Sequence, residues 1–205
     1  MKVIKQSQRT LKKAITVIKS GGVVICPTDT VYGFLADATN KKAVEKIYKI
    51  KKRPKSKPLS VFIKDLHMAK ELAEINDKQA KILQKYWPGK YTFVLKHKLW
   101  DVRRPTIYGV VKETIAIRIP KYVFLNQLLK KVNRPLVQTS VNMSGQAPLV
   151  KIGDILKQFQ DIAGSDPAES DPAILLIDAG NLKKGKPSKI IDLRSKTEGV
   201  LTRLR

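Results

Sequence analysis

The 205-residue sequence has few residues that bind metals or form cross-links: one cysteine, Cys26, and two histidines, His67 and His97. A single cysteine cannot form an internal disulfide, and no Cys/His group has the spacing of a structural zinc site. Cys26 ends an apolar run, which favours a buried core thiol over a nucleophile. Both histidines lie in segments of mixed polarity, so we expect them at the surface and not at a metal or catalytic centre.

Long apolar runs are also absent. No uninterrupted stretch approaches the length of a membrane span, and the N-terminus lacks the apolar core of a signal peptide. We therefore expect a cytoplasmic protein without a membrane segment. The hydrophobic content of 42% over this length can build a substantial core, so we expect a single domain over residues 1–205.

Acidic residues are scarce, with 17 Asp and Glu against 41 Lys and Arg, and the formal net charge is +24. This excess favours a polyanionic partner, which could be RNA, DNA, an anionic membrane surface or nucleotide phosphates. A solvated lysine-rich surface is the alternative that composition leaves open. Aromatic residues make up only 6% of the chain, which argues against sequence-specific RNA reading but not against binding of the RNA backbone.

The segment 23–33 organises the sequence. Val23–Cys26 is predicted to be a buried strand, and Pro27 ends it because proline cannot donate to the next ladder bond. Thr28, Asp29 and Thr30 then fall at the carboxyl end of a strand, where ligands of open α/β sheets usually bind. A turn capped by its own Thr and Asp side chains is the alternative. A second strand, 136–139, also ends in polar residues at 140–145 and strengthens the interpretation as a pocket.

Periodicity predicts an α/β protein in which helices and strands alternate. The predicted helices span 7–20, 40–52, 66–86, 123–132 and 152–159. The predicted strands span 23–26, 59–63, 91–95, 114–120, 136–139, 174–177 and 190–193. The segment 164–172, rich in Asp, Ser and Pro, is predicted to be a flexible loop. Trp87 is predicted to be a core or hinge aromatic.

Two sets of basic residues stand out from this pattern. Lys51, Arg53, Lys55 and Lys57 lie at or beyond the end of the helix 40–52, where cations suit the helix dipole and could reach ligand phosphates. A solvated helix face explains this cluster less well, because prolines stiffen a segment whose like charges repel. Arg118 interrupts an otherwise apolar strand, and a charge there must either form a buried ion pair or contact a ligand.

Five motifs in order carry a resemblance to a known family. They are Pro27-Thr28-Asp29-Thr30-Val31-Tyr32-Gly33, Lys51-Lys52-Arg53-Pro54, Trp87-Pro88-Gly89, Arg118 in its apolar strand, and Ser140-Val141-Asn142-Met143-Ser144-Gly145. Together they resemble the YrdC/TsaC family of L-threonylcarbamoyladenylate synthases, in its single-domain form. The resemblance implies a YrdC-like twisted, open sheet of mixed parallel and antiparallel strands, flanked by helices and enclosing a positively charged cavity.

The resemblance also implies an activity. Family members are nucleotidyltransferases that form L-threonylcarbamoyladenylate and pyrophosphate from L-threonine, bicarbonate or CO2, and ATP. The product serves the N6-threonylcarbamoyladenosine modification at position 37 of tRNA. The implied partners are the small-molecule substrates, tRNA through a nonspecific basic surface, and the downstream tRNA threonylcarbamoyl-transferase machinery, with no membrane partner. Mg²⁺ would be carried with ATP, without a protein metal site.

The resemblance assigns roles residue by residue. Lys51 and Arg53 match a Lys-x-Arg motif and would act as catalytic residues on the triphosphate. The other implied ATP contacts are Lys57, Thr92, Ser140, Asn142 and Arg203. The implied threonine contacts are Thr30, Arg118 and Ser188. The sequence departs from the family at Lys57, where many relatives have asparagine, and at Phe62, where longer relatives place a histidine; Val141 replaces the commoner alanine.

Two other functions remain open at this stage. The protein could be a basic RNA-binding module, for which the net charge is the main support. It could also be a non-catalytic paralogue of the same fold that uses the cavity for another small ligand. The intact Lys-x-Arg and Ser-x-Asn motifs favour the synthase over the paralogue.

Overall fold

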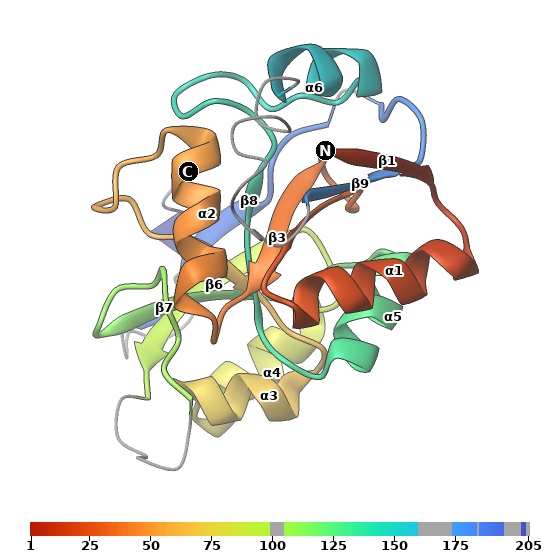
Figure 1. The fold of residues 1–205 in the computed structure, drawn as a ribbon. Coiled ribbons are helices and arrows are strands. Elements are labelled where there is room, and N and C mark those ends of the chain that lie inside the picture. The colour runs from red at the N-terminus through yellow and green to blue at the C-terminus, as the bar shows by residue number, and fades with distance from the viewer. Residues whose placement is uncertain (99–104, 160–173, 184, 195–201, 204–205) are drawn as a thin grey trace.

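The computed structural model describes residues 1–98, 105–159, 174–183, 185–194 and 202–203, which form one sheet with helices on both faces (Figure 1). The strands are β1 (Lys2–Lys5), β2 (Val23–Cys26), β3 (Gly33–Asp37), β4 (Ser60–Phe62), β5 (Ala73–Glu74), β6 (Tyr91–His97), β7 (Thr114–Arg118), β8 (Leu136–Ser140), β9 (Ile174–Asp178), β10 (Lys189–Asp192) and β11 (Thr202–Arg203). The helices are α1 (Gln8–Lys19), α2 (Lys41–Lys51), α3 (Leu66–Leu72), α4 (Asp77–Tyr86), α5 (Val123–Val132) and α6 (Ile152–Phe159).

The sheet is mixed, as expected. Its order is β1-β9-β2-β3-β8-β4-β7-β6-β10-β11, and β5 pairs with β6. Strand β2 is parallel to β9 and antiparallel to β3, while β4 is parallel to β7 and antiparallel to β8. The open sheet of parallel and antiparallel strands flanked by helices confirms the predicted fold class.

Alternating side chains divide the core between the two faces of the sheet. On one face Leu35 packs with apolar residues of α1 and α5, which lie side by side in Figure 1. On the other face Phe34 packs with residues of α2 and α6, and its ring meets that of Phe159 edge to face. The sheet is therefore covered by helices on both faces. The polar turn after β2 and the basic loop after α2 both start from elements packed into this core.

The predicted helix over 66–86 is wrong as a single element. Helix α3 ends at Leu72, and β5 follows because Ala73 pairs with His97 of β6. A new helix then begins after the N-cap residue Asn76, whose side chain accepts from Gln79 N while the Gln79 side chain accepts from Asn76 N. This capping box starts α4 in the middle of what periodicity alone joins into one helix.

Four strands were not predicted: β1, β3, β5 and β11. Strand β3 is buried at every position and pairs with both β2 and β8, although it directly follows the polar turn 27–32. Strand β1 is mostly exposed and pairs with β9 at the edge of the sheet. The loop predicted over 164–172 lies outside the described residues.

The cysteine, one tryptophan and the two histidines discussed in the sequence analysis lie mostly where they were expected. Cys26 is fully buried, and burial raises the pKa of its thiol, as suits a core residue. Trp87 is buried against Phe93, which confirms a core aromatic. His67 is exposed, but His97 is half-buried at the end of β6, and burial lowers its pKa, so a surface position for His97 was wrong. None of the helices in the described ranges is long and apolar enough to cross a bilayer.

Candidate functional site

The turn between β2 and β3 uses one of its threonines to hold itself together. The Thr28 hydroxyl accepts from the backbone N–H groups of Thr30 and Val31, at 3.0 and 3.3 Å, and lies 2.7 Å from the Val31 carbonyl oxygen. Thr28 is buried, and its hydroxyl lies 2.9 Å from that of Thr30, while the side chains of Asp29 and Thr30 also reach Arg118 of another strand. The turn is therefore both self-capped and a source of polar groups.

Arg118, the last residue of β7, is the charged centre toward which this turn reaches. Its guanidinium forms a buried ion pair with Asp29, donates from Nε to the Gly89 carbonyl at 2.8 Å, and lies 3.4 Å from the Thr30 hydroxyl through Nη1. Its side chain is 2% exposed and that of Asp29 is 8% exposed. Burial lowers the pKa of Arg118, and the Asp29 carboxylate opposes that shift. The ion-pair alternative for Arg118 is therefore realised, and Thr30 lies beside the pair.

A row of polar side chains extends from Arg118 across the same face of the sheet. Phe93 pairs with Ile117 in the core, so the preceding Thr92 and the following Arg118 face the opposite side. The Thr92 hydroxyl lies 3.0 Å from that of Ser188, which brings together two residues predicted to contact different substrates.

Ser60 and Gln138 continue this row and were missed by the sequence analysis. They are register partners on β4 and β8, half-buried, with Gln138 Nε2 2.5 Å from the Ser60 hydroxyl. On this face Phe62 of β4 and Leu136 of β8 join the core with α1 and α5, and Ser140 lies two residues after Gln138. Polar residues at alternate positions of a predicted strand were the signal that could have found them.

Gly185 allows another segment to lie against the turn. A Cβ atom at this position would stand 2.7 Å from the Thr30 carbonyl oxygen, closer than real Cβ contacts come. The chain that leads to Ser188 thus passes directly over Thr30. A side chain larger than hydrogen at 185 would push the two segments apart.

Lys51 fixes the Ser-x-Asn segment, which begins at the last residue of β8. This last residue of α2 is 1% exposed, and its ammonium donates to the carbonyls of Ser140 and Asn142 and to Asn142 Oδ1, the latter two at 2.8 and 2.9 Å. The Ser140 hydroxyl donates to the same Oδ1 at 2.6 Å. Asn142 Nδ2 in turn donates to the carbonyls of Met143 and Gln146. All three N–H groups of the ammonium are used within the protein, and its predicted contact with phosphate stays a prediction.

Arg53 organises the basic loop that follows α2. Its Nε donates to the Lys57 carbonyl at 2.9 Å and its Nη2 to the Pro58 carbonyl at 2.7 Å. The Tyr48 hydroxyl also donates to the Lys57 carbonyl, at 3.2 Å. Backbone oxygens therefore surround the guanidinium and hold a loop of like charges in one shape, while the Lys57 side chain is exposed.

The remaining predicted ATP contact, Arg203, lies in β11, where it pairs with Ile191 of β10. Thr30, Arg118, Thr92 and Ser188 thus gather on one side of the sheet, and Lys51, Ser140 and Asn142 form a second cluster. The clusters are joined by the register pair of Gly33, just after the turn, with Ser140.

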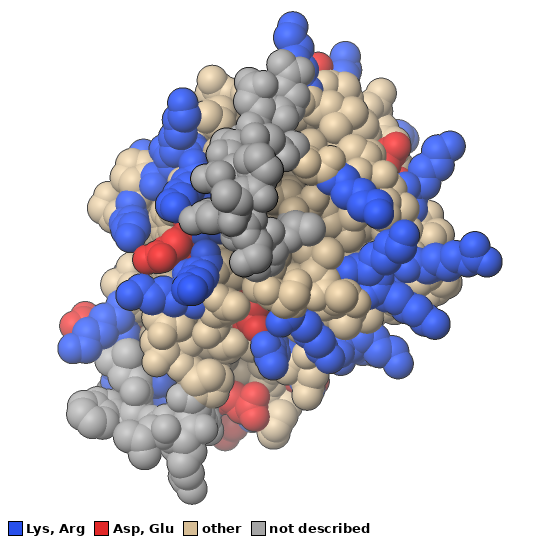
Figure 2. All heavy atoms as spheres, in the orientation of Figure 1, with Lys and Arg blue, Asp and Glu red and all other residues tan. Residues whose placement is uncertain are grey.

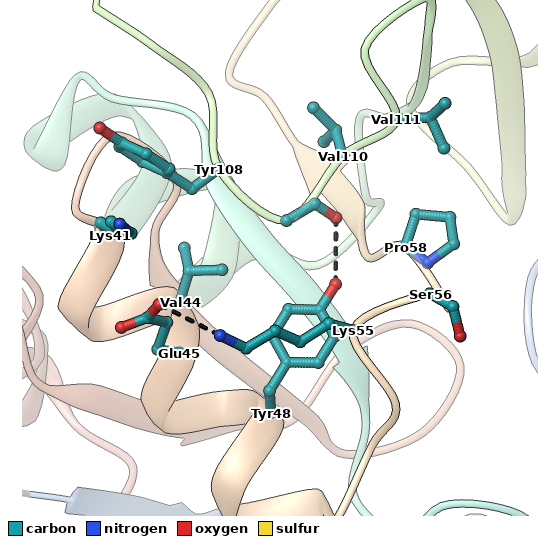
Figure 3. A pocket seen from close by; sticks show the side chains of 11 residues that line it. Lys41, Val44, Glu45, Tyr48, Lys55, Ser56, Pro58, Tyr108, Val110 and Val111 are labelled. Atoms are coloured by element: carbon teal, nitrogen blue, oxygen red, sulfur yellow. Dashed lines mark hydrogen bonds and ion pairs between the residues drawn. The ribbon is translucent and has the colours of Figure 1, made fainter.

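A cavity of about 300 Å³ opens on the outer side of α2, apart from these clusters. Figure 3 shows Tyr48 beneath the loop, with its hydroxyl 3.4 Å from the Gly109 carbonyl, and Lys55 directed toward Glu45 at 3.4 Å. The other lining residues come from α2, the loop 55–58 and the segment 108–111. None of the predicted site residues lines it, so the predicted positively charged cavity around the motifs stays a prediction.

The burial of Lys51 predicts a pH-dependent stability. Burial, with a smaller contribution from Arg53, lowers the pKa of Lys51 to about 7, against about 10.4 for a lysine in an unfolded chain. Between these values the unfolded state binds more protons, so raising the pH stabilises the fold. Relative to Lys51→Met, the free energy of unfolding of the wild type is expected to rise by up to about 1.4 kcal/mol per pH unit from pH 7 to 9.

Urea denaturation of both proteins at pH 7, 8 and 9 checks this expectation, because titrations elsewhere in the chain cancel in the comparison. A difference in stability that stays constant across the three pH values would contradict it.

Comparisons with known proteins agree with the motifs. The family model described as "Telomere recombination", for Sua5, YciO and YrdC proteins, matches residues 16–204. A Methanocaldococcus jannaschii protein, provisionally named a threonylcarbamoyl-AMP synthase, is 35% identical over 211 residues, covering 98% of this chain and 93% of its own length. A threonylcarbamoyl-AMP synthase of Vibrio vulnificus is 29% identical over 188 residues, covering 90% of this chain and 94% of its own.

Solved structures give the same result for the fold. P. abyssi Sua5, crystallised with L-threonine, matches with a TM-score of 0.78 and 28% identity, over 100% of this chain. The chain spans 56% of that protein's length. E. coli YciO matches with a TM-score of 0.79 and 24% identity, over 100% of this chain and 92% of its own.

Proposed function

Since the chain belongs to the Sua5/YciO/YrdC family, we propose that it is a threonylcarbamoyl-AMP synthase. It would form L-threonylcarbamoyladenylate and pyrophosphate from L-threonine, bicarbonate or CO2, and ATP, as a nucleotidyltransferase. The observation that carries the proposal is the meeting of Thr30, Asp29 and Arg118 beside a Ser140–Asn142 segment that a buried lysine holds. One group suits a small zwitterion, and in the proposal the other binds the nucleotide.

The chemistry of this reaction needs positive charge. The threonine amine first forms a carbamate with CO2, and a carbamate oxygen then attacks the α-phosphorus of ATP. The bond from that phosphorus to the leaving pyrophosphate breaks, and negative charge on the phosphate oxygens must be neutralised. In the proposal Lys51 and Arg53 supply that charge from the end of α2 and the loop after it.

The other side chains divide between the two substrates. Threonine contacts Thr30, Arg118 and Ser188. ATP contacts Lys57, Thr92, Ser140, Asn142 and Arg203. The hydrogen bond between Thr92 and Ser188 favours a boundary between the two substrates at that pair.

Magnesium enters this scheme with ATP. Within the described ranges, no three His, Cys, Asp or Glu side chains gather as a metal site. Hard-cation sites that bind Mg²⁺ through nucleotide commonly draw most ligands from phosphate oxygens and water. When bound, the ion would neutralise phosphate charge alongside Lys51 and Arg53.

The basic surface supports a role near tRNA. Figure 2 shows Lys and Arg side chains gathered on the two sides of the visible face, with few Asp and Glu among them. Exposed lysines of α1 and α5 belong to this surface, including Lys12, Lys13, Lys130 and Lys131. We propose that it binds tRNA nonspecifically, while the labile product passes to a tRNA threonylcarbamoyl-transferase for the modification at position 37.

The test is pyrophosphate release from ATP and Mg²⁺, measured with threonine or bicarbonate omitted in turn. Release is expected only when both are present, because the attacking carbamate needs both. Release without threonine would contradict the proposal. Absence of any release, together with tRNA binding that weakens steeply with salt, would favour the RNA-binding module instead.

A further inference from the structure

Asp29 has an oxygen that the fold leaves without a donor. Its Oδ1 binds Arg118, but Oδ2 is buried and accepts no hydrogen bond from the described residues. The side chain as a whole is 8% exposed, so bulk water does not readily solvate this atom. A buried carboxylate oxygen without a donor is costly, and a donor supplied by a ligand removes that cost.

The neighbouring guanidinium defines what kind of ligand fits. The contacts of Arg118 with Asp29, Gly89 and Thr30 use three of its N–H groups. An arginine has five, so two are left by these contacts for an acceptor. The geometry of a guanidinium matches a carboxylate or a phosphate, and in the proposed function the carboxylate is that of the amino acid substrate.

We infer that Asp29 Oδ2 accepts the α-ammonium group of the amino acid substrate, while Arg118 binds its carboxylate. In this arrangement the positive ammonium group of the amino acid lies at the negative Asp29, and its negative carboxylate lies at the positive Arg118. Each charge of the ligand is neutralised by one member of the ion pair. The Thr30 hydroxyl, 3.4 Å from Arg118 Nη1, is placed to reach the substrate side chain. This inference rests on the proposed function and adds a residue that selects α-amino acids over α-hydroxy acids.

Comparing L-threonine with an analogue that has a hydroxyl in place of the α-ammonium group tests the inference on the wild-type protein. L-Threonine and 2,3-dihydroxybutanoate of matching configuration differ in having ammonium or hydroxyl at the α-carbon. Calorimetric titration of the wild-type chain is expected to show at least about 30-fold tighter binding of L-threonine, because the carboxylate oxygen loses its charged donor in the hydroxy acid. Equal affinity for the two ligands would overturn the inference.

The variant Asp29→Asn supplies the second measurement. Asparagine keeps the shape and the oxygen that faces Arg118 but replaces the free acceptor with an amide N–H₂. L-Threonine binding is expected to weaken at least about 10-fold, while binding of the hydroxy acid changes less than about threefold. Loss of affinity for both ligands to the same extent would mean that Asp29 only holds Arg118, and would overturn the inference.

The outcome for Asp29 is separable from that for the proposed function. Pyrophosphate release that requires threonine and bicarbonate establishes the activity whatever the titrations give. If the wild type releases pyrophosphate in this way but does not discriminate between the two ligands, the inference fails and the proposed function stands. If it binds no L-threonine and releases no pyrophosphate, both fail.

Discussion

Lys51→Ala is expected to lower the rate of pyrophosphate release about 100-fold to 1000-fold, the range typical of losing one preorganised charge-stabilising group. The substitution removes a positive charge and also the three hydrogen bonds that hold Ser140 and Asn142. The nucleotide would then meet a Ser-x-Asn segment that is no longer fixed. Pyrophosphate release at saturating substrates measures the effect, and the KM for ATP is expected to rise as well.

The matched control is Lys49→Ala. Lys49 lies two residues earlier on α2 and is exposed, so the variant truncates a lysine of the same helix end without touching the segment. Its activity is expected to stay within about twofold of the wild type. If Lys51→Ala is folded, as judged by its thermal transition, and retains more than a third of the activity, Lys51 has neither role.

Arg118→Met is expected to reduce the free energy of unfolding by about 3 to 5 kcal/mol, because it leaves Asp29 as a buried charge without its partner. It also leaves the Gly89 carbonyl without its donor from Nε. Denaturant titration at neutral pH measures the loss. Since the substitution also removes the proposed carboxylate contact, L-threonine binding is expected to disappear in any variant protein that folds.

A double variant separates charge from packing. Asp29→Asn combined with Arg118→Met is expected to be more stable than Arg118→Met alone, because no charge is then buried unpaired. Arg194→Met serves as the control, since the ion pair of Arg194 with Asp192 is 46% exposed on the arginine side and is expected to contribute less than about 1 kcal/mol. A double variant as unstable as the single one would show that the ion pair does not dominate the loss.

The sequence predicted the strands that carry the site better than it predicted the contacts within it. Val23–Cys26 and Leu136–Ser140 were recognisable because apolar runs there end in polar residues, and the structure places strands at both. Strand β3 was missed because it begins at the glycine that ends the turn, and its pairing with both β2 and β8 is decided by distant residues. Helix α4 was missed as a separate element because its start depends on a capping box, which periodicity does not register.

The site residues also differ in how far the local sequence could predict their contacts. Arg118 was recognisable as a charge in an apolar strand, and its two possible roles could not be separated until Asp29 was seen beside it. Lys51 looked like one cation among several at a helix end, since nothing in the local sequence indicates that it is 1% exposed. Burial of a lysine is a tertiary property, because the acceptors that make it tolerable come from residues about ninety positions later.

The position of Lys51 couples two parts of the molecule that lie on different layers. Its side chain holds Asn142, and its own carbonyl accepts from Ser144 N at 2.9 Å, so the helix end and the segment after β8 are fastened at two points. Helix α2 packs on the Phe34 face of the sheet, whereas Ser140 pairs with Gly33 at the strand end beside the turn. We therefore expect a displacement of α2 to shift the Ser-x-Asn segment with it, because both sets of hydrogen bonds connect the same two segments.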